Sequence, residues 1–220
     1  MNDTSGAKLY PPVEEKINIA SHALGLLLSI AALIVLVRTS HATGDPWNIV
    51  IFGIFGLSLI LLYATSTLYH SATEPLRRQK LRIVDHAMIY VLIAGSYTPL
   101  TLVTLKGALG WTIFSASWAM AITGITLKIF FTGRYNLFST LMYVFMGWIV
   151  VFAIDPLTRS LSLHGLYWLL AGGLAYTVGA ILYAFKRIPF NHAIFHLFVL
   201  VGSACHFFCV YFYVLPAAQP

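Results

Sequence analysis

Long apolar stretches separated by short polar breaks dominate the chain. A helix of roughly 20 apolar residues is long enough to cross a membrane. The breaks contain proline, glycine or charged residues, as in Gly44-Asp45-Pro46, and none leaves room for an extramembrane domain. The predicted spans are Ile17–Val37, Trp47–His70, Ile83–Leu105, Leu109–Ile129, Leu137–Ile154, Leu161–Phe185 and Asn191–Leu215.

This pattern predicts an all-α membrane protein with a seven-transmembrane helix bundle. We expect one transmembrane domain over residues 17–215, a short N-terminal tail over residues 1–16 and a short C-terminal tail over residues 216–220. The alternation of apolar and polar residues that marks the strands of a membrane barrel is absent from the sequence.

Composition supports the assignment to a membrane and excludes several function classes. The chain has 220 residues, of which 59% are hydrophobic and 9% are charged, whereas soluble domains carry about 25% charged residues. Too few polar side chains are present to cover a soluble globule of this size. A soluble enzyme and a nucleic-acid-binding protein are therefore excluded, and the expected partners are membrane lipids.

The basic residues set the expected orientation. Ten of the 13 lysines and arginines fall on the side that holds the N-terminus and the second, fourth and sixth loops. Cytoplasmic loops are enriched in lysine and arginine. We therefore predict a cytoplasmic N-terminus, an outside C-terminus and insertion in the plasma membrane, which for a bacterial chain is the inner membrane.

Several ionisable residues fall near the cytoplasmic ends of the predicted spans. His70 ends the second span, Asp85 lies near the start of the third, and His192 and His196 open the seventh. His192 and His196 are four residues apart, so both imidazoles project from the same helix face. Ser66 lies one helical turn deeper than His70. Because ionisable groups inside membrane segments are rare and mostly functional, this layer of the bundle is the expected site.

Three histidines with an open fourth position are typical of catalytic zinc sites, in which zinc lowers the pKa of a bound water to near 7. The expected metal ligands are His70, His192 and His196, with Zn²⁺ as the cofactor. A carboxylate such as Asp85 can hold the water or accept its proton. Asp85 is therefore an expected catalytic residue.

The other histidines are expected to have other roles. His22 is the one alternative ligand, although we expect it to lie beside the ligands or at the interface. His206 is about 15 Å deeper than His196 at about 1.5 Å per residue, so we expect a buried, hydrogen-bonded residue or a pocket residue. For His86 we expect packing or a hydrogen bond. His41 and His164 fall on the outer side.

The ordered motifs resemble a known family. Ser66-Thr-Leu-Tyr-His70, Asp85-His86 and His192-Ala-Ile-Phe-His196, together with the strings STLYHS, DHAMIYVLIAGSYTPL and KRIPFNHAIFH, resemble the hemolysin III branch of the progestin and adipoQ receptor (PAQR) proteins, within the wider CREST group that includes alkaline ceramidases.

The resemblance implies a seven-helix bundle with a buried zinc near the cytoplasmic side, held by the same three histidines. It also implies that Asp85 holds the zinc-bound water and that Ser66 polarises the substrate or stabilises an oxyanion, so that Asp85 and Ser66 are the expected catalytic residues. Three functions follow as hypotheses: a metal-dependent hydrolase of a lipid amide or ester with an acyl chain, a non-enzymatic membrane-homeostasis or sensor protein with structural zinc, and a cytolytic or pore-forming hemolysin.

Overall fold

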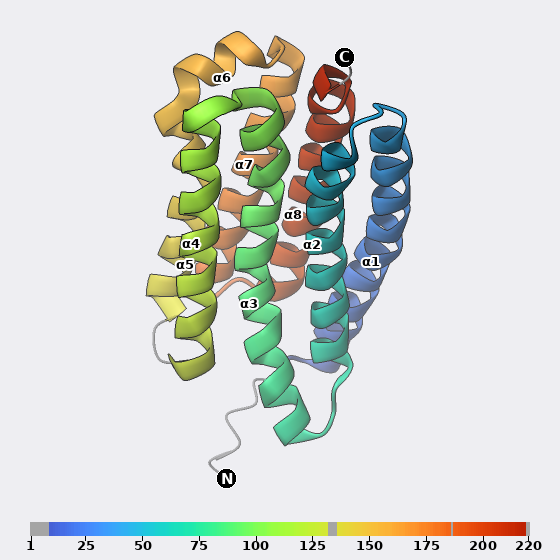
Figure 1. Cartoon of the computed structure of the whole chain (residues 1–220). Helices are drawn as coiled ribbons and strands as arrows, with labels where there is room; N and C mark the ends of the chain where they lie inside the picture. Colours follow the sequence, from blue (N-terminus) through green and yellow to red (C-terminus); the bar gives the residue numbers. More distant parts are fainter. Residues whose placement is uncertain (1–8, 132–135, 186, 219–220) are drawn as a thin grey trace.

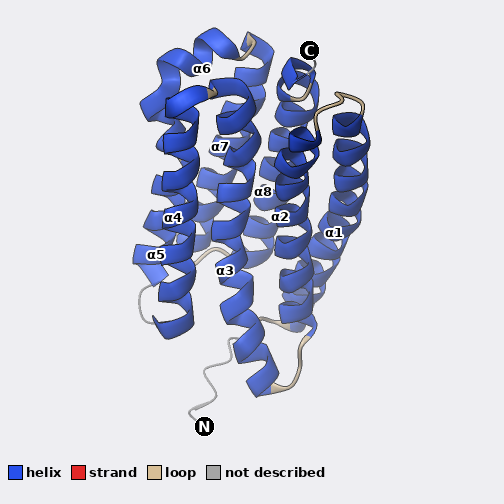
Figure 2. Cartoon of the chain, viewed as in Figure 1, coloured by secondary structure: helices blue, strands red, loops and turns tan. Residues whose placement is uncertain are grey.

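The fold was described from a computed structural model of the chain, for residues 9–131, 136–185 and 187–218. Every regular element in these ranges is a helix (Figure 2). The α-helices are α1 (Pro12–His41), α2 (Pro46–Ser71), α3 (Pro75–Pro99), α4 (Gly107–Phe131), α5 (Asn136–Gly147), α6 (Ile154–Ser160), α7 (Leu163–Ala184) and α8 (Asn191–Cys209).

These helices form seven segments that are long and apolar enough to cross a membrane, as the sequence predicts. Figure 1 shows them as one bundle, in which α1 begins at the lower end and α8 finishes at the upper end. In the bundle α2 packs against α1 and α3, and α8 packs against α1 and α7. Helix α2 carries the predicted ligand His70, and α8 carries the predicted ligands His192 and His196. These two helices therefore share α1 as a neighbour.

The polar breaks stop and restart the helices through specific caps. The Asp45 side chain accepts a hydrogen bond of 2.9 Å from the Trp47 backbone N–H at the start of α2. Glu74 does the same for α3, where it accepts from the Leu76 and Arg77 N–H groups at 2.9 and 2.7 Å. A side-chain acceptor at this position satisfies N–H groups that have no partner within the helix.

The third and fifth spans depart from a regular α-helix. After Pro99, α3 continues as a π-helix over Leu100–Leu105. The fifth span consists of α5, a 3₁₀-helix over Ile149–Ala153 and α6. At this break the Tyr97 hydroxyl donates to the Gly147 carbonyl at 2.7 Å and accepts from the Val150 N–H at 3.1 Å. Tyr97 thereby supplies partners for backbone groups that a continuous helix would pair internally.

The bundle has polar groups inside and large apolar side chains outside. The outward-facing apolar residues include Leu27, Leu28 and Ile34 on α1, each more than half exposed. The buried ionisable residues, among them Glu14, Arg78 and Asp85, gather toward the end of the bundle where α1 begins. This distribution suits a lipid environment, in which apolar surface needs no cover and polar groups need partners.

Alanine substitutions at two glycines would test the close packing of α2 and α3. A β-carbon at Gly95 on α3 would lie 2.6 Å from the Ser58 β-carbon on α2, whereas one at Gly53 would meet no atom within 4 Å. Gly95→Ala is expected to lower the free energy of unfolding by about 1–3 kcal/mol through overpacking, and Gly53→Ala to keep or raise it. Thermal unfolding in detergent measures both, and equal midpoints would contradict the close α2–α3 contact.

Candidate metal centre

Three histidine rings meet at the end of the bundle where α1 begins. The Nε2 atom of His192 lies 3.0 Å from Nε2 of His70 and 3.1 Å from Nε2 of His196. All three residues are buried, and their ligand nitrogens lie within 4.8 Å of one another. Residues 122 positions apart in the sequence are thus brought together by the packing of α2 and α8 around α1.

The arrangement of the three nitrogens suits a metal cation. Zinc binds imidazole nitrogen at about 2.0–2.1 Å with tetrahedral geometry, which places ligand nitrogens roughly 3.3 Å apart. Hydrogen bonding among the rings explains the geometry less well, because Nε2 of His192 carries one proton or one lone pair and faces two nitrogens at once. The three histidines are therefore close enough to bind one metal ion, as the sequence predicts.

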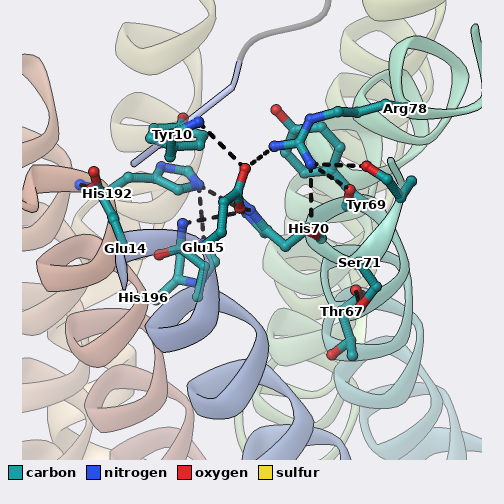
Figure 3. Close-up of polar contacts among 12 residues, drawn as sticks. Tyr10, Glu14, Glu15, Thr67, Tyr69, His70, Ser71, Arg78, His192 and His196 are labelled. Carbon is teal, nitrogen blue, oxygen red and sulfur yellow. Dashed lines mark hydrogen bonds and ion pairs between the residues drawn. The ribbon is translucent and has the colours of Figure 1, made fainter. Parts of the chain in front are cut away.

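Glu15 and Arg78 fix the His70 ring. The Nδ1 atom of His70 lies 2.6 Å from Oε2 of Glu15, and the other Glu15 oxygen accepts a hydrogen bond from the Arg78 guanidinium (Figure 3). A carboxylate on Nδ1 holds the proton at that nitrogen and leaves the Nε2 lone pair for a metal. Arg78 is one of the basic residues used above to predict the orientation, and it is only 2% exposed.

Arg78 also closes the end of α2. Its Nη1 atom donates to the backbone carbonyls of Tyr69, His70 and Ala72 at 3.3, 3.4 and 3.1 Å. The last carbonyls of a helix have no partner within it and carry partial negative charge, so a buried guanidinium there is favourable. The same side chain therefore orders the turn that carries His70 and the carboxylate that orients its ring.

Glu14 positions His192 from a different helix. The residue before α8 is Phe190, whose side chain makes no capping hydrogen bond. The Glu14 carboxylate instead accepts a 3.1 Å hydrogen bond from the His192 backbone N–H. Glu14 and Glu15 lie in the first turn of α1, which begins at Pro12, five residues before the predicted span. From the sequence we placed Glu14 and Glu15 in the polar N-terminal tail and missed their role at the site. The available signal was that two of only seven acidic residues are adjacent there.

Aromatic rings fix the planes of two of the three imidazoles. Tyr10 stacks on His192, with centroids 4.4 Å apart and planes 10° apart, and His22 stacks on His196 at 3.6 Å and 12°. Burial raises the pKa of the Tyr10 hydroxyl well above its usual value, so this phenol stays neutral. His22 thus packs beside the histidine triad and is outside the set of atoms that can share one ion.

A cavity of about 320 Å³ opens from the triad into the bundle. His192, His196, Asp85 and Ser66 all line it, so the two predicted catalytic residues share one space with two of the predicted ligands. Ser66 approaches the Asp85 carboxyl closely enough to interact with it. Its hydroxyl oxygen makes no hydrogen bond of regular geometry with the rest of the described chain.

The remaining histidines fall into two groups, one that lines the cavity and one that is exposed. His206 and His86 also line the cavity, and the Tyr143 hydroxyl donates to the backbone carbonyl of His86 at 2.9 Å. The Nε2 atom of His206 is buried and has no hydrogen-bond partner among the described residues, so the expected hydrogen bond is not found at that nitrogen. His41 and His164 are exposed and lie outside the triad.

Seven apolar spans around a buried histidine triad define a multi-pass membrane protein with a candidate metal centre. Residues 11–207 match the family described as "Haemolysin-III related", and the chain belongs to this family.

Three curated relatives agree with this membership. The chain is 51% identical over 206 residues to "Hemolysin-3" of Bacillus cereus, covering 94% of each chain. It is also 51% identical over 200 residues to "Hemolysin-3 homolog" of Bacillus subtilis (strain 168), covering 91% of this chain and 94% of that one. A more distant similarity, 28% over 215 residues, extends to "Monocyte to macrophage differentiation factor" of Homo sapiens, covering 93% of this chain and 87% of that one.

The contact between Glu15 and His70 predicts an effect on metal affinity. Glu15→Gln removes the charge that holds the His70 proton on Nδ1, so the affinity for Zn²⁺ is expected to fall by about 10–100-fold. Competition with a chromophoric chelator measures it. The matched control is Asp155→Asn, because Asp155 is an exposed carboxylate paired with Arg159 at 2.9 Å. Equal affinities for Glu15→Gln and wild type would refute the orienting role.

Proposed function

We propose that this protein is an intramembrane zinc-dependent hydrolase that cleaves a lipid amide or ester. The observation that carries the proposal is the shared cavity, which two members of the histidine triad, the Asp85 carboxylate and the Ser66 hydroxyl all line, and whose surface is mostly apolar. A lipid substrate needs both parts of this cavity, because its reacting carbonyl needs the polar groups and its hydrocarbon chain needs the apolar surface. Membership of the Haemolysin-III related family supports the membrane setting.

His70, His192 and His196 would hold the metal, and three protein ligands leave a fourth tetrahedral position for water or substrate. When bound, zinc polarises a carbonyl and lowers the pKa of a water molecule toward 7. Glu15 keeps the His70 proton away from the ligand nitrogen, and the stacked rings of Tyr10 and His22 keep the other imidazoles oriented.

Asp85 is the proposed general base. It is buried and opens onto the cavity from α3, opposite the α8 histidines. In the proposed reaction its carboxylate accepts the proton of the attacking water and then passes it to the leaving amine or alkoxide. General base catalysis of this kind contributes about 10²–10⁴-fold to a rate.

Ser66 is the proposed oxyanion donor. Its hydroxyl is buried in the cavity wall and lacks a regular hydrogen bond within the described part of the chain. It can therefore donate to the carbonyl oxygen as negative charge develops there. Donors placed in advance at that position stabilise the transition state more than the ground state.

The proposed location is the bacterial plasma membrane, with the triad near its cytoplasmic face. The basic residues predicted to form the second loop, Arg77, Arg78, Lys80 and Arg82, lie in the first turns of α3, just after the short connection from α2. Arg78 among them lies beside the triad (Figure 3). Basic loops favour the cytoplasm. A lipid would enter from the bilayer with its carbonyl toward the triad and its acyl chain along the apolar cavity.

Two other functions remain as hypotheses with distinct outcomes. A sensor or homeostasis protein would hold zinc without turnover. Cytolysis is suggested only by the name "Hemolysin-3" of the relatives. The mostly apolar cavity lining favours lipid binding over ion conduction.

The proposal predicts fatty-acid release from a panel of lipid amides and esters by the purified, zinc-loaded protein, measured by mass spectrometry. Asp85→Asn is expected to lower kcat by about 10²–10⁴-fold and Ser66→Ala by about 10²–10³-fold, both with unchanged metal content. Asp155→Asn is the matched control. A wild-type protein with one equivalent of zinc and no turnover on the whole panel would contradict the hydrolase and favour the non-enzymatic function.

A further inference from the structure

A second polar cluster lies deep in the same cavity, away from the triad. His206 on α8 and Tyr176 on α7 line the cavity there, with ring centroids 5.3 Å apart. His206 follows His196 by ten residues on one helix, which places it about 15 Å further along the bundle. The cavity therefore reaches from the triad to a second polar cluster further along α8.

The helices leave specific room for these two side chains. A β-carbon at Gly172 on α7 would lie 2.1 Å from Cδ2 of His206, and one at Gly202 on α8 would lie 2.6 Å from the Tyr176 ring. Each helix thus has a glycine at the point where the ring from the other helix packs. The His206 imidazole is held tightly against α7 and cannot tilt toward it.

The hydrogen bonds among the other members of this cluster do not involve Nε2 of His206. The Ser203 hydroxyl oxygen lies 2.8 Å from the Tyr63 hydroxyl and 2.9 Å from the Tyr176 hydroxyl, so these three groups satisfy one another. The Nε2 atom of His206 is buried and makes no hydrogen bond within residues 9–131, 136–185 and 187–218. A buried polar atom without a partner is costly, and the side chain that carries this one lines the cavity.

We propose that His206 recognises a hydroxyl group in the middle of an acyl chain whose polar head lies at the histidine triad. This inference rests on the proposed function only in placing a lipid in the cavity. A hydroxyl suits the imidazole because it donates and accepts, and so pairs with either tautomer. An extended chain advances about 1.25 Å per carbon for tetrahedral C–C bonds of about 1.5 Å, so 15 Å corresponds to about twelve carbons.

The test is displacement of tritiated octadecanoic acid from the zinc-loaded protein in detergent. The competitors are unlabelled octadecanoic acid, 12-hydroxyoctadecanoic acid and 3-hydroxyoctadecanoic acid. Wild type is expected to prefer the 12-hydroxy acid over the unsubstituted acid by about fivefold to tenfold, the effect of one added hydrogen bond to a buried partner. The 3-hydroxy acid is expected to gain no contact with His206.

His206→Leu is expected to abolish this preference while binding of the unsubstituted acid persists. The matched control is His164→Leu, which removes an exposed imidazole on α7 and should keep the wild-type preference. Each fatty acid also partitions into the detergent micelles, to the same extent with every protein. This effect cancels when the ratio of the affinities for the two acids is compared between wild type and variant. The zinc content of each variant checks that it folds. The preference of wild type for the 12-hydroxy acid over the unsubstituted acid is a test that needs no variant.

Equal affinities of wild type for the 12-hydroxy and unsubstituted acids would overturn the inference, as would an unchanged preference in His206→Leu or no binding of either acid. A protein that shows the preference but hydrolyses no lipid would refute the proposed hydrolase and support the role of His206.

Discussion

Every polar group buried in a membrane bundle needs a partner, and the His70–His192–His196 cluster depends on that constraint. Three Nε2 atoms lie close together on buried side chains. Neutral imidazoles cannot all satisfy one another in this geometry, because each Nε2 carries either one proton or one lone pair. A single cation satisfies all three. The surrounding structure serves the same end, since Glu15 holds the opposite nitrogen of His70 and Glu14 anchors the backbone of His192.

The same constraint links the metal centre to the cavity. The buried Arg78 and the partly buried Glu15 are tolerated here because they form one connected network with His70. On the other side of the triad the surface of the cavity is mostly apolar, with polar groups that include Asp85, Ser66 and, further along, His206. A long molecule with a carbonyl at one end fits this division of polar and apolar surface.

The sequence predicted the seven spans from local signals, and it predicted the triad because the order of the spans places the end of the second and the start of the seventh on the same side of the membrane. Apolar stretches have a minimum length set by the bilayer, and His192 and His196 share a helix face through their spacing. The contacts of Glu14, Glu15 and Arg78 were missed because they join residues separated by 178, 55 and 63 positions.

Hydropathy also could not locate the break in the fifth span or the early start of α1. Hydropathy reports side chains, whereas the break depends on the Tyr97 hydroxyl, which bonds backbone groups of another helix. Likewise α1 begins at Pro12 because its first turn packs Glu14 against α8, a contact that an acidic residue before an apolar stretch does not reveal.

X-ray absorption at the metal K-edge tests the convergence of the three imidazoles most directly. The protein would be purified from cells without added chelator and measured in detergent. The account predicts zinc at one equivalent per chain, three imidazole nitrogens at about 2.0–2.1 Å with their characteristic outer-ring scattering, and one lighter ligand. Sulfur in the first coordination sphere, fewer than three imidazoles, or a protein that purifies folded without any metal would contradict it.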